Sequence, residues 1–204
     1  QLEKEYIFKK VWLYACRAEQ LEEPGSFLVV DLDVCQTSVL LVRDNQNKIR
    51  AYHNMCSHRG NKMAYDKTGK TENLICGFHG WTYGLDGQLN FVPDEDNYFD
   101  IEKSELGLSP VNVDTWEGFV FVNVDPSPKE SLSEYLGELG TGLAGYPFNK
   151  LSGKCHRFET VVNANWKLVK DAFQEACHTP YQHRRSLPDA YRNSENPHTR
   201  HIDI

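Results

Sequence analysis

Two short pairs of cysteine and histidine constrain this chain more than any other feature of its sequence. The pairs are Cys56 with His58 and Cys76 with His79, and 17 residues, 59–75, separate them. Thiolates and imidazoles at such short spacing are typical metal ligands. Whatever fold the chain adopts must therefore bring these two segments to one place.

Two kinds of metal centre fit this ligand set. Two thiolates and two imidazoles can hold a tetrahedral zinc ion. They can also hold a [2Fe–2S] cluster in which two histidines replace two cysteines on one iron. In a zinc finger the second pair usually opens a short helix, whereas here both pairs are expected in loops that end in glycine, Gly60 and Gly80. Two such loops can clamp a flat cluster from opposite sides, so the pattern favours the cluster.

Short strand-forming runs separated by turn signals fill the chain between residues 25 and 125. A run at 39–42 and another at 49–52 flank the turn-forming residues 44–47, as in a β-hairpin. Similar pairs of runs lie at 81–83 with 88–91 and at 111–113 with 119–122. This density of short strands predicts a compact all-β domain over 25–125.

The regions on either side of this domain have different patterns. Residues 1–24 are expected to form a lead-in of a short helix and a strand. Residues 126–150 are expected to form a linker and a short helix, which Ser131 and Glu134 open as a capping box. The sequence at 140–145 matches G-x-G-x-x-G, but a helix and not a strand precedes it. We therefore interpret it as flexible linker and not as a dinucleotide site.

A second group of ionisable residues lies in a predicted helix that begins near Asn165, after a predicted strand at 157–162. At about 100° per residue, Asp171, Glu175 and His178 fall within about 60° of one another on one helix face.

A break in this helix completes the pattern. Pro180 ends the helix after Thr179, and the turn can return His183 to the side of His178. Two histidines and a carboxylate suit a non-haem Fe(II) site with open positions for O₂.

The composition argues against two classes of partner. The 204 residues include 22 Lys and Arg against 29 Asp and Glu, a net charge of −7, which is unfavourable for nucleic-acid binding. The longest apolar runs, 38–42 and 118–122, are much shorter than the roughly 18 residues of a membrane span.

The cysteine content indicates the cellular compartment. The six cysteines show no Cys-x-x-Cys spacing and are too few for a disulfide scaffold, which predicts a reducing compartment, the cytoplasm.

Both groups of residues resemble those of Rieske non-haem iron ring-hydroxylating oxygenases, in the N-terminal portion of the large (alpha) subunit. Residues 56–61 and 76–83 resemble the two loops of the Rieske [2Fe–2S] domain of these oxygenases and their ferredoxins. Residues 165–183 resemble the segment of the large subunit that binds the mononuclear iron. The resemblance implies an α+β fold: an all-β Rieske domain, then the start of a helix-grip catalytic domain at 151–204.

For the cluster, the resemblance implies that Cys56 and Cys76 bind one iron and that His58 and His79 bind the other. Trp81 stands where respiratory Rieske proteins carry a serine that donates a hydrogen bond to sulfur. Such hydrogen bonds raise the reduction potential, so a value near the low end of the range of roughly −150 to +300 mV is expected.

For the mononuclear Fe(II), the resemblance implies that His178 and His183 are ligands. Glu175 takes the place of an acidic residue that connects the two metal centres between subunits, and Asp171 stands near the iron. In the family the third ligand is a carboxylate far downstream of the two histidines, which places it here beyond residue 204.

The implied activity is hydroxylation of an apolar, aromatic substrate with O₂ and with electrons from a reductase or ferredoxin. The implied assembly is a homotrimer, which in some members includes a small subunit. One rival is a Rieske ferredoxin-like electron carrier, which would need only residues 25–125 and not the segment 165–183. Another is a zinc-stabilised binding module, which would be colourless.

Overall fold

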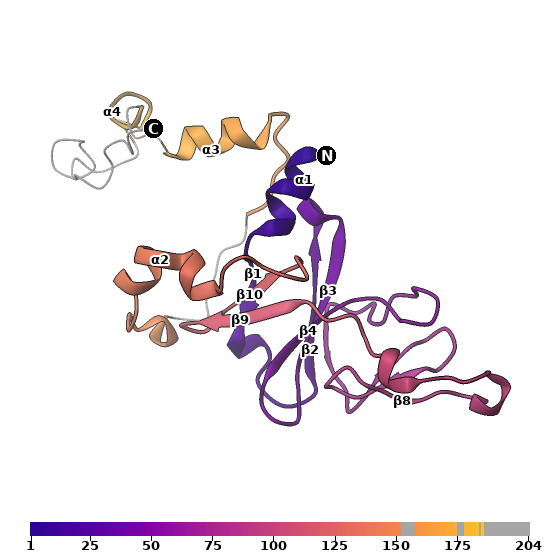
Figure 1. The fold of residues 1–204 in the computed structure, drawn as a ribbon. Helices are drawn as coiled ribbons and strands as arrows, with labels where there is room; N and C mark the ends of the chain where they lie inside the picture. Colours follow the sequence, from indigo (N-terminus) through magenta and orange to yellow (C-terminus); the bar gives the residue numbers. More distant parts are fainter. Residues whose placement is uncertain (152–157, 175–177, 184, 186–204) are drawn as a thin grey trace. The chain divides into compact units, whose positions relative to one another are not determined.

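The computed structural model describes residues 1–151, 158–174, 178–183 and 185, and the chain divides into two compact units, 1–151 and 152–204. The first unit contains three antiparallel sheets (Figure 1). An all-β domain with helical additions is confirmed for this part of the chain. Among the described residues, no helix is long and apolar enough to cross a membrane.

The four-stranded sheet lies at the centre of the first unit, in the order β4-β3-β2-β5. Its strands are β2 (Ser26–Leu32), β3 (Thr37–Arg43), β4 (Ile49–His53) and β5 (Thr68–Lys70). The predicted hairpin is confirmed: β3 pairs with β4 in the register Val39 to His53, and the turn between them begins at Asp44.

Both faces of this sheet are covered, which explains the uninterrupted apolar run in β3. Leu40 and Val42 belong to one apolar core, whereas Val39 and Leu41 belong to the other. All four side chains are fully buried. Successive residues of a strand point to opposite faces, so a strand between two cores must be apolar at every position.

The two outer sheets supply the other sides of these cores. The first is β1-β10-β9, with β1 (Leu13–Arg17), β9 (Asn112–Trp116) and β10 (Phe119–Asn123), and it contributes Val120 and Val122 to one core. The second is β6-β7-β8, with β6 (Leu74–Ile75), β7 (Thr82–Tyr83) and β8 (Leu89–Phe91), and it contributes Tyr83 and Leu89 to the other. The hairpins predicted at 81–91 and 111–122 are confirmed.

Short helices and turns connect the strands, and one α-helix lies at each end of the first unit. The α-helices of the first unit are α1 (Leu2–Tyr6) and α2 (Leu132–Gly142). The 3₁₀ turns are Phe8–Lys10, Ala18–Gln20, Asp33–Cys35, Glu95–Asn97, Lys103–Glu105 and Phe148–Lys150. The capping box is confirmed, since the Ser131 hydroxyl accepts from the Glu134 N–H and the Glu134 carboxylate accepts from the Ser131 N–H.

The interpretation of 140–145 as flexible linker is wrong at its first residues, which belong to the last turn of α2. Gly140 is buried, and a Cβ built on it would lie 2.9 Å from the Cβ of Leu136 and 3.7 Å from the Nε1 of Trp116. The glycine is therefore needed because a Cβ there would collide with Leu136, one turn earlier in α2, a requirement that the spacing of the motif does not reveal.

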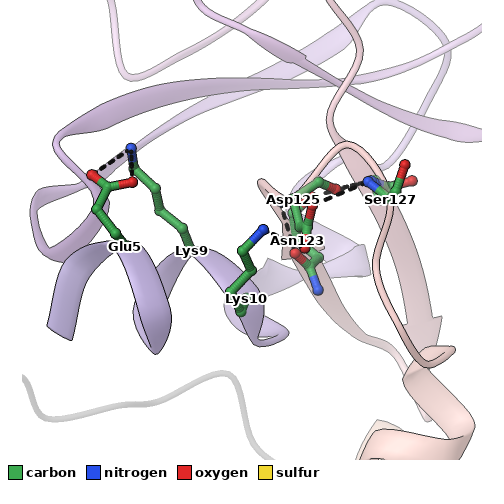
Figure 2. Close-up of polar contacts among 7 residues, drawn as sticks. Glu5, Lys9, Lys10, Asn123, Asp125 and Ser127 are labelled. Atoms are coloured by element: carbon green, nitrogen blue, oxygen red, sulfur yellow. Dashed lines mark hydrogen bonds and ion pairs between the residues drawn. The ribbon is translucent and has the colours of Figure 1, made fainter. Parts of the chain in front are cut away.

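An ion pair fastens the N-terminal segment to the domain. Lys10 Nζ lies 2.9 Å from Oδ2 of Asp125, which follows β10 and is 7% exposed (Figure 2). The Asp125 backbone N–H donates to the Asn123 side chain, and the Asp125 carboxylate accepts from the Ser127 N–H. One buried carboxylate thus holds the lead-in and the start of the connection to α2 in place.

The second unit contains two described helices, α3 (Trp166–Gln174) and α4 (Thr179–Gln182). The helix predicted from Asn165 is confirmed, and the Asn165 side chain caps it by accepting from the Lys167 N–H at 3.0 Å. The strand predicted at 157–162 is wrong over 158–162, whose residues are exposed and not in a strand. A strand needs a neighbour for its hydrogen bonds, and the described residues of this unit form no sheet.

The buried carboxylate of Asp44 organises the turn between β3 and β4. It accepts hydrogen bonds from the backbone N–H groups of Gln46 and Lys48 and from Arg50 Nε at 2.7 Å. Burial by itself would raise the pKa of Asp44, but these hydrogen bonds outweigh it and hold that pKa below its usual value.

We expect Asp44→Asn to lower the free energy of unfolding by about 1–2 kcal/mol at pH 7, because the charge-assisted bond to Arg50 is lost. A depressed pKa stabilises the fold above the unfolded value of about 3.9, and this contribution is lost as the pH falls through the folded pKa. The stabilities of variant and wild type in urea unfolding should therefore converge only as the pH falls below the folded pKa of Asp44. The control is Asp86→Asn, at an exposed turn residue that accepts from the Gln88 N–H. If Asp44→Asn lost the same free energy of unfolding at pH 7 and at low pH, the stabilising role of the Asp44 charge would be contradicted.

Candidate metal centre

The two Cys–His segments form the same backbone turn. The carbonyl of Cys56 accepts from the Gly60 N–H at 3.0 Å, and the carbonyl of Cys76 accepts from the Gly80 N–H at 2.9 Å. Both glycines have a positive φ, +71° and +70°, a conformation that a side chain would strain. The prediction that both pairs lie in loops is confirmed, and the positive φ explains why each loop ends in glycine.

The two cysteines lie side by side at the bottom of these loops. Each is 2% exposed, both belong to the same apolar core, and neither is in a disulfide. Burial raises the pKa of the Cys56 thiol. Burial also opposes ionisation of Cys76, but the backbone N–H groups of Phe78 and His79 point at its sulfur and hold its pKa below the usual value. Such donors suit a thiolate ligand.

The two histidines lie above the sulfur atoms, nearer to solvent. Their ring centroids are 4.7 Å apart, His58 is half-buried and His79 is exposed. The indole of Trp81 stacks on the His58 ring at 4.7 Å with an angle of 6° between the planes. Burial, together with the charges of His79 and Arg59, lowers the pKa of His58, which favours the neutral imidazole that binds metals.

Tyr83 is a site residue to which the sequence reasoning gave no role. Its hydroxyl lies 3.1 Å from the Cys56 sulfur and 3.3 Å from the Ser57 N–H, and its ring is fully buried. Tyr83 thus supplies a hydroxyl to the Cys56 sulfur from strand β7, whereas Trp81 stands at the position of the respiratory serine. Alternation along that strand indicates that Tyr83 points inward, but it does not indicate which sulfur it meets.

The four side chains form two pairs and do not surround one point. In the part of the chain that the structure describes, no three His, Cys, Asp or Glu side chains are placed to hold a single metal ion. A tetrahedral zinc site would need all four around one ion. Two buried sulfurs beside two surface imidazoles instead fit the two irons of a [2Fe–2S] cluster, one per pair.

The second group of predicted ligands lies in the second unit. The rings of His178 and His183 are 5.2 Å apart, so the predicted return of the chain is confirmed. His178 precedes α4 and is in no helix. The prediction that it lies on one helix face with Asp171 and Glu175 therefore does not hold for His178. The expectation that Pro180 ends the helix is wrong, because residue 180 lies in the first turn of α4, where a proline costs no helical hydrogen bond. Asp171 is exposed on α3, and Glu175 lies outside the described residues.

Comparison with known proteins decides the family. The family model of the Rieske [2Fe-2S] domain matches residues 11–116, more than half of the chain. The chain belongs to the Rieske [2Fe-2S] domain family. Members carry a [2Fe–2S] cluster, and this chain presents two cysteines and two histidines with the arrangement that such a cluster requires.

The relatives of this Rieske chain are oxygenase subunits. The chloroplastic choline monooxygenase of Spinacia oleracea is 32% identical over 186 residues, which are 89% of this chain and 42% of that protein. The quaternary ammonium Rieske monooxygenase CntA, solved with L-carnitine, has a TM-score of 0.78 and 28% identity over 91% of this chain and 53% of that one. Naphthalene 1,2-dioxygenase from Rhodococcus sp., solved with indole, has a TM-score of 0.75 and 30% identity over 90% and 42%. The chain spans about two-fifths of the length of the curated relatives that it matches.

Removing the Tyr83 hydroxyl is expected to lower the reduction potential of the Rieske cluster, because a hydrogen bond to a ligand sulfur stabilises the reduced, more negative state. Tyr83→Phe keeps the ring in the core. The matched control is Tyr52→Phe, because Tyr52 is buried in the same core and its hydroxyl donates to the carbonyl of Leu85. Protein-film voltammetry should show a lower midpoint for Tyr83→Phe alone. Equal shifts in both variants would mean that the potential responds to core packing and not to the bond.

Proposed function

We propose that the protein is the oxygenase component of a Rieske non-haem iron system, a mono- or dioxygenase that hydroxylates a small organic molecule. Electrons come from a reductase or ferredoxin, and O₂ is the oxidant. When bound, the cluster supplies one-electron transfer and a mononuclear Fe(II) supplies O₂ activation. The similarity to choline monooxygenase and to CntA supports this proposal.

One observation favours an oxygenase over an electron carrier. The imidazoles of His178 and His183 are brought to 5.2 Å from each other in the same chain that carries the Rieske loops. A ferredoxin-like carrier has no use for a second histidine pair. We therefore assign His178 and His183 as ligands of the mononuclear iron.

We assign the cluster ligands by the same chemistry. Cys56 and Cys76 would hold the buried iron, and His58 and His79 would hold the outer iron. This arrangement directs electron transfer through the imidazoles, because they are the ligands nearest to the surface.

The two acidic residues have supporting roles in this proposal. Glu175 is close to His178 in sequence and would accept a hydrogen bond from an imidazole, which orients that ring and connects the cluster of one subunit with the iron of the next. Asp171 would help to shape the iron site from α3. Both roles are positioning roles, in which the acidic side chain acts through a ligand.

The substrate class is proposed from the relatives. Choline monooxygenase and CntA with L-carnitine favour a quaternary ammonium compound. The aromatic substrate expected from the sequence is supported by the similarity to naphthalene 1,2-dioxygenase, solved with indole. Product analysis with choline, carnitine and naphthalene as parallel substrates distinguishes these two candidates.

The organisation of the protein is proposed as follows. Residues 1–24 are a lead-in, 25–125 the Rieske domain, 126–150 a linker with a short helix, and 151–204 the beginning of the catalytic domain. The active assembly would be a homotrimer, with or without a small subunit. The four cysteines among the described residues are free, which supports a reducing compartment such as the cytoplasm.

Purified protein is expected to be red-brown and to contain two acid-labile sulfides per chain, because each Rieske cluster has two bridging sulfides. His58→Ala should remove the cluster, whereas His53→Ala, at a strand histidine that is 3.1 Å from the Thr37 hydroxyl, should keep it. Absorption and electron paramagnetic resonance spectra report the cluster. A colourless protein with one zinc ion would overturn the assignment.

In the full-length protein, His183→Ala is expected to lower the iron content from about three per subunit to about two, because only the mononuclear iron is lost. Glu175→Gln should keep all the iron and slow single-turnover oxidation of the reduced cluster under O₂ with substrate. Iron analysis and stopped-flow absorption measure the two effects. Two irons in the wild type would favour the electron carrier, and loss of iron in Glu175→Gln would make Glu175 a ligand.

A further inference from the structure

A strongly acidic segment with two exposed aromatic residues lies beside the cluster loops. Residues 94–105 carry six carboxylates and one lysine, a net charge of −5 out of −7 for the whole chain. Phe99 is fully exposed and Tyr98 is 37% exposed. Such a concentration of like charge repels itself, and a fully exposed phenylalanine adds no packing, so the fold by itself does not account for this surface.

This segment forms one wall of a groove that reaches His58. The groove has a volume of about 400 Å³, and the lining includes the His58 ring, Tyr98 and Phe99. Three carboxylates, Asp100, Glu102 and Glu105, line it as well. The Tyr98 ring lies 6.3 Å from the His58 ring and 6.1 Å from Trp81. The groove therefore joins an acidic surface to the edge of a cluster ligand.

We propose that this groove, lined by His58, Tyr98, Phe99, Asp100, Glu102 and Glu105, is the docking surface for a redox protein with a basic rim around an apolar centre. The reduced partner loses one electron and the oxidised cluster gains it, with no bond made or broken. The inference deepens the proposed function and rests on it, because it names the surface at which the electron donor binds.

Two features identify the partner by its chemistry. An exposed aromatic centre with charged residues around it is the usual arrangement of a protein interface, and the carboxylates on both sides of Tyr98 and Phe99 require a complementary positive rim. Glu95 already has Lys103 as a partner at 2.9 Å, whereas Asp100 and Glu105 lie in the groove itself. Long-range attraction between the two surfaces would speed encounter and turn the donor towards His58.

The test uses the full chain with its cluster and, as a basic one-electron probe, cytochrome c. Asp100→Asn with Glu105→Gln removes two carboxylates from the groove, and Asn tolerates the positive φ of Asp100. The control, Asp33→Asn with Glu138→Gln, removes two exposed carboxylates elsewhere, so both variants have the same net charge. Phe99→Ser removes the apolar contact. Cluster content and midpoint potential are measured for every variant.

At about 0.01 M ionic strength the groove variant is expected to bind the probe about tenfold more weakly, and the control less than about twofold. The difference should vanish near 1 M salt, where the Debye length is about 3 Å. Phe99→Ser should weaken binding at both salt concentrations, because an apolar contact is not screened. Equal weakening in groove and control variants would show attraction to net charge alone and overturn the proposal.

Two further outcomes separate this inference from the function on which it rests. If the wild type holds no [2Fe–2S] cluster, the proposed function fails whatever the binding data show. If the cluster is present and unchanged but Phe99→Ser dissociates an oligomer in sedimentation without affecting the probe, the groove is an interface between copies of this chain, and the docking proposal is wrong.

Discussion

Two cysteine sulfurs must be buried next to each other while two imidazoles beside them remain near solvent, and the rest of the first unit depends on this requirement. Cys56 and Cys76 are 2% exposed and belong to the same apolar core as Leu40 and Tyr83. The loops that carry them leave that core through turns closed by Gly60 and Gly80. A rigid core on one side and a tight turn on the other give each loop little freedom. The core and the turns thus fix the positions of the ligand side chains, which lowers the cost of ordering the site.

The central sheet makes this possible because it lies between two cores, of which only one includes the cluster ligands. Its one face packs against the core that includes the cysteines, and its other face packs against the sheet β1-β10-β9. The second core therefore stabilises the domain without contributing ligands. The ion pair of Lys10 with Asp125 and the buried Asp44 act at the edges of this framework, where they hold the lead-in and a hairpin turn.

Tyr83 contributes both to the packing of the core and to the environment of a cluster ligand. Its ring fills the core between the outer and central sheets, and its hydroxyl contacts the Cys56 sulfur. A residue of this kind connects stability with the potential, because any change that moves the ring also moves the donor. The histidine side of the site has the opposite character: it is exposed, it is flanked by Trp81 and Tyr98, and it borders the acidic groove. The buried half of the site provides the sulfur ligands, and the half nearer to solvent is suited to exchanging electrons.

The sequence by itself determined the elements that depend on local patterns. The spacing within each Cys–His pair, Cys56 with His58 and Cys76 with His79, predicted metal-binding loops, the turn residues predicted the hairpins, and Ser131 with Glu134 predicted the start of a helix, because each pattern involves near neighbours in the chain. Only the tertiary structure decided which residues meet across long separations. Tyr83 reaches Cys56 because their strand and loop share one core, Gly140 is buried close to Trp116 of strand β9, and residues 158–162 form no strand because no neighbouring strand pairs with them. These outcomes depend on packing partners far away in sequence, and no local pattern records them.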